Sequence, residues 1–208
     1  REKATSNICT AQALLAIMAG MYAAYHGPKG LHAIAERIHT LAAILDDNLK
    51  AMGYVLPNAH YFDTLFIETD GKMQEHLKTI SQAHEVNFYY PATGGVQISL
   101  DETITLRDVE QIVRIFAEAK GIQHAFSAVE PSQVRIFKPL LRDTPCLSHP
   151  VFSAYHTESK MMRYIKRLEN RDLSLMHSMI SLGSCTMKLN AATELMPVSW
   201  PEFANLHP

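Results

Sequence analysis

The chain has 208 residues, of which 47% are apolar and 19% are charged, and its formal net charge is −2. This length fits one ordinary domain, or one domain with part of a neighbour, and the apolar share excludes a mainly disordered chain. The near-neutral charge without a dense Lys/Arg run excludes the electrostatic footprint of a nucleic-acid-binding protein. No apolar stretch reaches the ~20 residues that a membrane helix needs.

The cysteines argue against cross-linked or zinc-bound structure. Cys9, Cys146 and Cys185 are far apart, odd in number and form no C-x-x-C pair. Neither a disulfide framework nor a thiolate zinc site is therefore predicted, and we expect a reducing compartment. The chain opens at Arg1 without an initiator Met and stops at Pro208 without a polar tail, so we expect a piece of a longer protein.

Two helices are predicted at the start of the chain. Residues 8–25 are rich in Ala, Leu, Met and Ile, and a helix that is apolar nearly all round is usually buried on several sides. Gly27 ends this helix, and Pro28 suits the first turn of a second helix over residues 28–52, which Gly53 should cap. Its apolar residues recur at helical spacing: Leu31, Ile34, Ala35, Ile38, Leu41, Ala42 and Leu45.

Alternating strand and helix patterns follow. The predicted elements are a strand at 63–69, a helix at 72–84, strands at 87–90 and 96–100, and a helix at 106–120. Thr105 and Asp108 resemble a helix N-terminal cap, and Gly121 a C-terminal one. The order β-α-β-β-α predicts an α/β (α+β) domain with a small antiparallel sheet, of the split β-α-β kind.

The last part of the chain is predicted to be a linker followed by helices. Four prolines punctuate residues 130–150, which predicts an extended linker with one short turn. Residues 157–171 form a predicted helix capped by Thr157, and its inner face comprises Met161, Tyr164, Ile165 and Leu168. A short helix over 173–182 and a loop over 183–186 should follow.

Several histidines are candidate ligands or catalysts. His32, Glu36 and His39 share one helix face, a spacing that could begin a metal site, but a solvated polar face is the favoured interpretation. His76 and His84 lie two turns apart and are weaker candidates. His149 and His156 flank an apolar pair, and we favour turn residues over a catalytic pair.

Two segments could hold an anion. Gly94-Gly95 could approach a phosphate, but no phosphate-binding glycine motif surrounds it and its flanks resemble strands, so a tight hairpin turn is favoured. Ser6 and Asn7 precede the first helix, where an anion could bind at the N-terminus, although simple capping explains them better.

The loop Gly183-Ser184-Cys185-Thr186-Met187-Lys188 brings together several reactive or ligand-binding side chains. It offers two hydroxyls, a thiol and an ammonium, which suit phosphate or carboxylate binding or a redox-sensitive thiol. A nucleophilic Cys185 would need a nearby base, which the sequence does not place. Composition alone slightly favours a structural loop.

Two long blocks carry a family resemblance. Residues 1–16 read REKATSNICTAQALLA, residues 168–190 read LENRDLSLMHSMISLGSCTMKLN, and the chain closes with WPEFANLHP. In this order the blocks resemble the glycine decarboxylase P-protein family, and the middle of the chain matches more loosely.

The resemblance implies a pyridoxal-phosphate-dependent parent with two halves of aminotransferase-like fold (fold type I). Residues 1–54 would be the helical tail of the first half's large domain, 55–130 its small α/β domain, and 131–208 a linker with the start of the second half. The implied parent decarboxylates glycine, with the cofactor as electron sink, and passes the aminomethyl group to the lipoyl group of H-protein. A homodimer is implied, in a bacterial cytoplasm by preference or in a mitochondrial matrix.

The chain departs from the family where the cofactor is anchored. The family's cofactor lysine lies in a His-Lys pair that a Gly-rich run follows, and this sequence has no His-Lys dipeptide. We therefore assign no Schiff-base lysine and no cofactor-binding residue here, and expect an inactive fragment. Ser184, Cys185 and Thr186 match the family's expected active-site loop. The alternative is a non-enzymatic α/β interaction or regulatory module.

Overall fold

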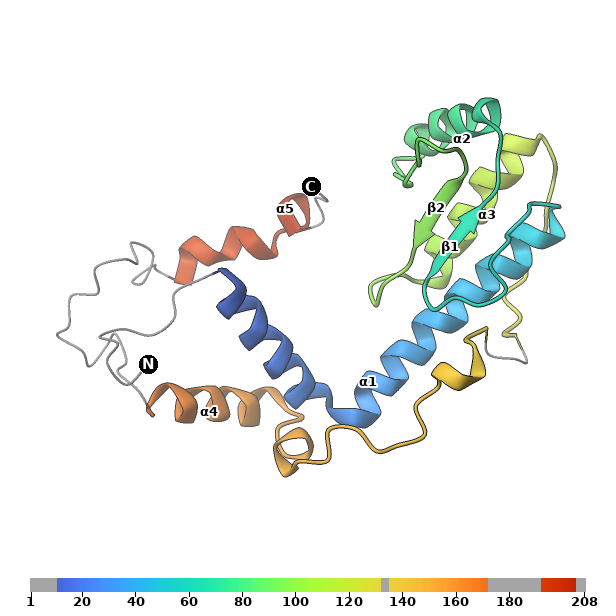
Figure 1. Cartoon of the computed structure of the whole chain (residues 1–208). Helices are drawn as coiled ribbons and strands as arrows, with labels where there is room; N and C mark the ends of the chain where they lie inside the picture. Colours follow the sequence, from blue (N-terminus) through green and yellow to red (C-terminus); the bar gives the residue numbers. More distant parts are fainter. Residues whose placement is uncertain (1–10, 132–134, 172–191, 205–208) are drawn as a thin grey trace. The chain divides into compact units, whose positions relative to one another are not determined.

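The structure is a computed structural model that describes residues 11–131, 135–171 and 192–204 (Figure 1). The chain divides into two compact units, one formed by Pro28–Leu147 and the other by Arg1–Gly27 together with Ser148–Pro208. We call them the central unit and the terminal unit and describe each by itself.

The long helix α1 spans Ala11–Ala51 and is interrupted at Gly27, whose φ of 64° and ψ of −179° are not helical. Pro28 follows the break, where its missing N–H costs no helical hydrogen bond. The prediction of two successive helices is therefore confirmed. Gly53 closes the second half of α1 in a left-handed conformation with φ of 77°, as expected for a C-terminal glycine.

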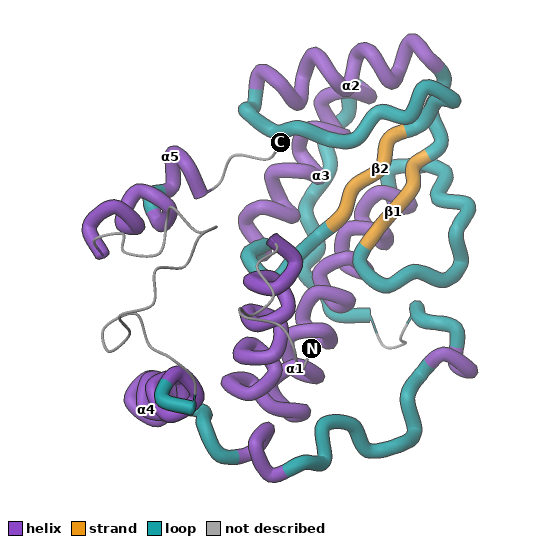
Figure 2. The backbone as a smooth tube through the Cα atoms, turned by 60° about the vertical axis from the view of Figure 1, so that its left-hand side comes forward, coloured by secondary structure: helices purple, strands orange, loops and turns teal. Residues whose placement is uncertain are grey.

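The central unit contains an antiparallel pair of strands, β1 at Thr64–Ile67 and β2 at Val96–Ser99 (Figure 2). Leu65 pairs with Ile98 and Ile67 pairs with Val96, and these four side chains are buried. The alternate residues are less buried, so one face of the sheet joins the core. Both strands lie within their predicted ranges.

The predicted strand at 87–90 is wrong except for one bridge. Tyr89 exchanges both backbone hydrogen bonds with Gln97, at 3.1 and 2.9 Å. The next hydrogen-bonded pair of an antiparallel ladder would join residue 91 to residue 95. Pro91 has no N–H to donate, so the ladder stops there. At the opposite edge of the sheet, Val55 forms a single bridge with Glu68, the residue that follows β1.

Two capped helices cover the sheet. Helix α2 spans Gly71–Ala83, and the Asp70 carboxylate accepts the Met73 N–H at 2.8 Å. Helix α3 spans Leu106–Lys120, and the Asp108 carboxylate accepts the Thr105 N–H at 2.7 Å, as the sequence predicts. Their apolar faces and the second half of α1 enclose one core whose fully buried members include Leu45, Leu49, Leu65, Ile67, Leu77, Val96, Val109, Ile115 and Phe116.

In the described residues of the predicted linker, which leave out 132–134, the structure has no strand or α-helix and one short 3-10 turn at Lys138–Leu140, as expected. In the terminal unit a second such turn, Pro150–Ser153, leads into helix α4 at Glu158–Glu169. The 3-10 segment Ala192–Ser199 precedes the short helix α5, Pro201–Ala204. The predicted helix at 173–182 lies outside the described residues.

The predicted burial differs from the structure in helix α4 and in the first half of α1, where Leu14 and Leu15 are 63% and 64% exposed. Met161 is buried as expected, but the side chain of Ile165 is 47% exposed. Helix α4 carries a clear apolar stripe, and the described residues cover only part of it.

Among the described residues, no helix combines the length and apolar character that a membrane crossing requires.

Candidate functional site

A buried carboxylate on α1 is the centre of the main polar cluster. Asp46 is fully buried, and its Oδ2 accepts hydrogen bonds from the Lys50 ammonium at 2.8 Å and from the Tyr61 hydroxyl at 2.9 Å. Its Oδ1 lies 2.8 Å from the same Lys50 nitrogen, as an ion-pair contact outside hydrogen-bonding geometry. A buried charge is tolerated when it is paired and hydrogen-bonded, and Lys50, one turn along the helix, supplies the opposite charge.

Tyr61 is held in its protonated form by this arrangement. Burial, and next the adjacent Asp46 carboxylate, raise the pKa of the Tyr61 phenol well above its usual value. Both causes disfavour a phenolate, because burial removes water and the neighbouring charge is also negative. Tyr61 therefore acts here as a fixed donor and not as a proton-transfer group.

His39 lies beside this cluster with both ring nitrogens engaged. Its Nδ1 is 2.8 Å from the Phe62 carbonyl oxygen, and its Nε2 accepts the Arg135 backbone N–H at 2.9 Å. The ring is therefore the Nδ1–H tautomer and has no free lone pair for a metal. His32 and Glu36 remain 3.6 Å apart on the exposed surface. The described residues include no group of three metal-ligating side chains arranged around a cation.

Two further residues of α1, Asp47 and Asn48, hold returning segments of the chain. The Arg135 guanidinium donates to Asp47 Oδ1 at 2.7 Å. The Asn48 amide donates to the Ile44 and Ser127 carbonyls, and its Oδ1 accepts from the Ser127 N–H and His124 Nε2, at 2.8 to 3.0 Å. All four hydrogen-bonding positions of Asn48 are thus used. The cluster positions the backbone and contains no activated nucleophile.

The Gly94-Gly95 turn borders a pocket of about 570 Å³. The Gly94 N–H donates to the Pro91 carbonyl, which confirms the predicted tight turn. Gly95 has φ of 83°, and a β-carbon there would lie 2.9 Å from the Ile67 carbonyl oxygen, so only glycine fits. The carboxylates of Glu68 and Asp70 line the pocket and would repel a phosphate.

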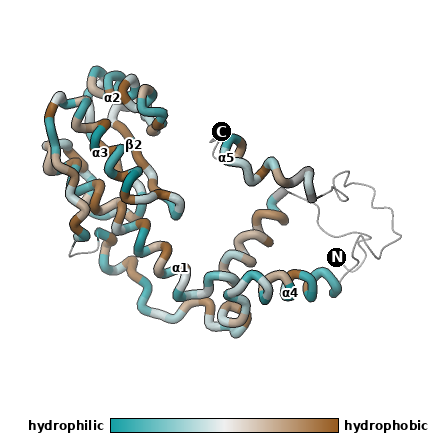
Figure 3. Tube along the Cα trace, turned by 180° about the vertical axis from the view of Figure 1, so that it is seen from behind, coloured by the Kyte–Doolittle hydropathy of each residue, from teal (hydrophilic) through white to brown (hydrophobic). Residues whose placement is uncertain are grey.

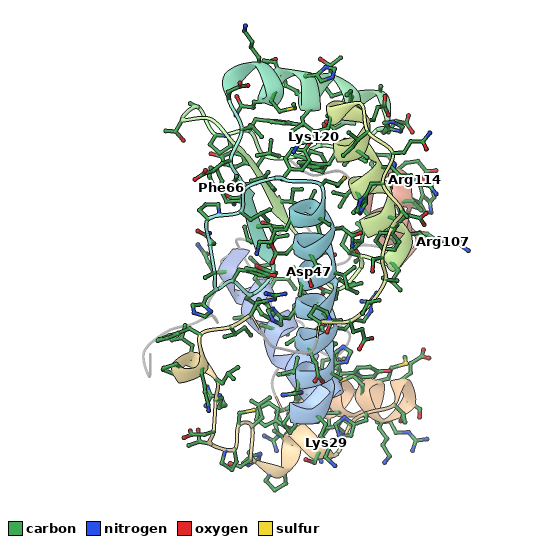
Figure 4. The ribbon with its side chains drawn as sticks, turned by 90° about the vertical axis from the view of Figure 1, so that its right-hand side faces the viewer. Lys29, Asp47, Phe66, Arg107, Arg114 and Lys120 are labelled. Atoms are coloured by element: carbon green, nitrogen blue, oxygen red, sulfur yellow. The ribbon has the colours of Figure 1, made fainter. Side chains whose placement is uncertain are left out.

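The pockets characterised among the described residues offer no lysine for pyridoxal phosphate. Four pockets of about 410 to 570 Å³ are lined by described residues, and no lysine lines any of them. Lys50 is paired with Asp46. Lys120, which is labelled in Figure 4, donates to the Met52 carbonyl at 2.8 Å, and its nitrogen lies 4.1 Å from the centre of the Tyr54 ring. A cofactor aldehyde needs a free lysine amine beside a cradle for its phosphate.

The other sequence candidates divide into two groups. Ser184, Cys185, Thr186 and Lys188, with Ser6 and Asn7, lie outside the described residues. His149 accepts the Val151 N–H at 3.2 Å at the start of the Pro150–Ser153 turn, as a turn residue would. His156 Nδ1 instead lies 2.6 Å from the Tyr25 carbonyl oxygen, a contact between residues far apart in the chain. The Asp46–Tyr61 pair was not predicted from the sequence. Its one sequence signal is an acid on the apolar stripe of α1 with a lysine four residues later.

Comparison with known proteins assigns the chain to a family. The model of the glycine cleavage system P-protein family matches residues 1–116, more than half of the chain. The chain therefore belongs to the glycine cleavage system P-protein family.

Named relatives match along the whole chain. The glycine dehydrogenase (decarboxylating) of Bacteroides thetaiotaomicron is 53% identical over 209 residues, and that of Christiangramia forsetii is 51% identical over 208 residues. The mitochondrial glycine dehydrogenase (decarboxylating) of Pisum sativum is 48% identical over 212 residues. All three matches cover 100% of this chain but only 20 to 22% of the relative. The chain thus spans about a fifth of the length of these relatives.

Proposed function

We propose that this chain is part of a glycine dehydrogenase (decarboxylating) of the glycine cleavage system. The observation that carries the proposal is an identity of about half to these enzymes over the full 208 residues, together with the family match over 1–116. The parent decarboxylates glycine with pyridoxal phosphate and passes the aminomethyl group to lipoylated H-protein. It has the aminotransferase-like fold type I and acts as a homodimer, in a bacterial cytoplasm by preference or in a mitochondrial matrix.

Within that parent we assign residues 1–54 to the first half's large domain, 55–130 to its small domain and 131–208 to the crossing into the second half. The chain's own contribution is to position backbone through the contacts of Asp46, Asn48 and Arg135. The cofactor would be anchored by residues outside this chain, so no chemical step is assigned to the described residues.

A segment swap tests this function. The matched segment of the Bacteroides thetaiotaomicron relative is replaced by this chain, and release of labelled CO2 from carboxyl-labelled glycine is measured with pyridoxal phosphate and lipoylated H-protein. We expect activity within about tenfold of the relative, a loss of ~1.4 kcal/mol or less. The matched control carries the Christiangramia forsetii segment instead. An inactive swap beside an active control would contradict the proposal.

The isolated chain tests the absence of a cofactor lysine. After incubation with pyridoxal phosphate and borohydride, we expect no stoichiometric adduct at a single lysine, since the four described pockets contain none. One fully modified lysine, located by peptide mass spectrometry, would contradict this expectation.

Ser184, Cys185 and Thr186 are our proposed active-site loop in the parent. In the swapped enzyme, Ser184→Ala and Thr186→Val should each lower glycine decarboxylation by at least about tenfold, a typical loss for one positioned donor. Cys185 is proposed as redox-sensitive, with Lys188 as the cation that favours its thiolate. An alkylation rate unchanged by Lys188→Ala would remove that rationale.

A further inference from the structure

The terminal unit lacks a core of its own among its described residues. In these residues the buried apolar side chains are Ala24 and Met161, whereas the central unit encloses a continuous cluster from Ile38 to Ala119. Helices in water derive most of their stability from burying an apolar face. The helices of the terminal unit therefore need a surface that the described residues do not supply.

Among the described residues, the first half of α1 presents the clearest face without a packing partner. Leu14, Leu15, Ile17 and Met18 are 57 to 64% exposed, and Tyr22 and Tyr25 continue the same side of the helix at 38 to 39%. Figure 3 shows the hydrophobic residues of this half of α1. Single exposed apolar residues are ordinary, but a contiguous patch of this kind marks an interaction surface.

The chemistry of this face restricts its partner. Residues 11–26, read AQALLAIMAGMYAAYH, contain no Asp, Glu, Lys or Arg. A charged or nucleic-acid partner therefore has nothing to pair with along this helix. The charge-depleted, aliphatic and aromatic surface resembles a domain interior, as permanent interfaces do.

We propose that this face of α1, Leu14 to Tyr25, docks against an apolar surface of the rest of the P-protein polypeptide. The relatives carry the matched segment within chains about five times as long, so most of their length is available to cover it. A second copy of this chain is the competing occupant. The inference rests on the proposed function in one respect, that this chain works within a longer P-protein.

Hydrogen exchange compares the isolated chain with the swapped Bacteroides thetaiotaomicron enzyme. Amides of residues 13–26 should exchange at least about tenfold more slowly in the swapped enzyme, since opening then requires undocking. Equal rates in the two proteins would overturn the proposal. Slow exchange in the isolated chain would also overturn it, whether the chain is monomeric or self-associates with concentration.

A double substitution on the exposed face locates the docking surface by a second route. Leu15→Gln with Met18→Gln keeps helix propensity but removes two apolar contacts. It should lower the binding of the dye ANS by the isolated chain, and raise exchange at 13–26 in the swapped enzyme at least about threefold, as expected for a weakened interface. The control Val129→Gln, at a position 75% exposed in the central unit, should change neither. Equal effects of both variants would overturn the assignment.

The decarboxylation assay separates the two proposals. A swapped enzyme with protected 13–26 but no activity would contradict the proposed function and leave the docking surface supported. An active swapped enzyme whose 13–26 amides exchange freely would contradict the docking surface alone.

Discussion

The carbonyl oxygen of Phe152 lies so close to Gly27 that a β-carbon at position 27 would come within 2.5 Å of it. The His156 ring adds to this crowding, because its Cε1 would lie 2.8 Å from the same β-carbon, while its Nδ1 is 2.6 Å from the Tyr25 carbonyl oxygen. The break in α1 is therefore where a distant turn of the terminal unit packs directly on the backbone.

Gly27→Ala should destabilise this local packing by about 1–3 kcal/mol, because a β-carbon meets both a φ of 64° and the Phe152 carbonyl. Faster hydrogen exchange in peptides around residues 20–27 and 150–157 would measure this loss of local stability. Gly20→Ala is the matched control, since nothing lies within 4 Å of its β-carbon position, and it should stabilise the helix by ~0.5–1 kcal/mol. Equal effects of the two substitutions would show that the close contact is absent.

Tyr61→Phe should lower the free energy of unfolding of the central unit by about 1–3 kcal/mol. The substitution leaves the buried Asp46 carboxylate with Lys50 as its remaining hydrogen-bond donor. Urea denaturation followed by circular dichroism measures the change. Tyr89→Phe removes a hydroxyl from a side chain that is 64% exposed and should cost under about 0.5 kcal/mol. A smaller loss at Tyr61 than at Tyr89 would rule out the buried pair.

Alkaline pH should destabilise the central unit. Burial raises the pKa of Tyr54 to about 12, against 10.0 for the free side chain, and the pKa of Tyr61 rises in the same direction. A raised folded-state pKa gives stability that is complete below pH 10 and is lost as pH rises towards 12, because the unfolded chain releases its proton first.

For Tyr54 alone the loss should reach about 2–3 kcal/mol. Tyr54→Phe should reduce the slope of the unfolding free energy against pH above 10. The substitution also removes, at every pH, the hydrogen bond that the Tyr54 hydroxyl donates to the Phe116 carbonyl at 2.7 Å. A slope unchanged by Tyr54→Phe would contradict a buried phenol.

Asp108→Ala should cost ~0.5–2 kcal/mol by removing the acceptor for the Thr105 N–H and hydroxyl at the start of α3. Glu110→Ala is the control on the same helix. It removes a surface ion pair with Arg114 and should cost under about 0.5 kcal/mol. Thermal unfolding of the two variants compares them directly, and a larger effect at Glu110 would be inconsistent with the cap.

Local signals explain which predictions the structure confirmed. The two capped helices, the break at Gly27-Pro28 and the turn at Gly94-Gly95 follow from residues within a few positions of one another. The strand at 87–90 was wrong because its extension depends on a partner across the sheet, and Pro91 removes the donor for the next pair. The exposure of Ile165 likewise depends on what packs against α4, which periodicity does not show.

The sequence by itself determined the family, the positions of helices α1 to α4 and the capping box of α3, because each depends on residue order or on neighbours along one element. Only the tertiary structure brought Asp46 to Tyr61, His39 to Arg135 and Gly27 to Phe152, since these residues are 15, 96 and 125 positions apart in the chain. Such contacts form when separate elements bury their apolar faces together, and the accompanying polar partners are then chosen by position in space.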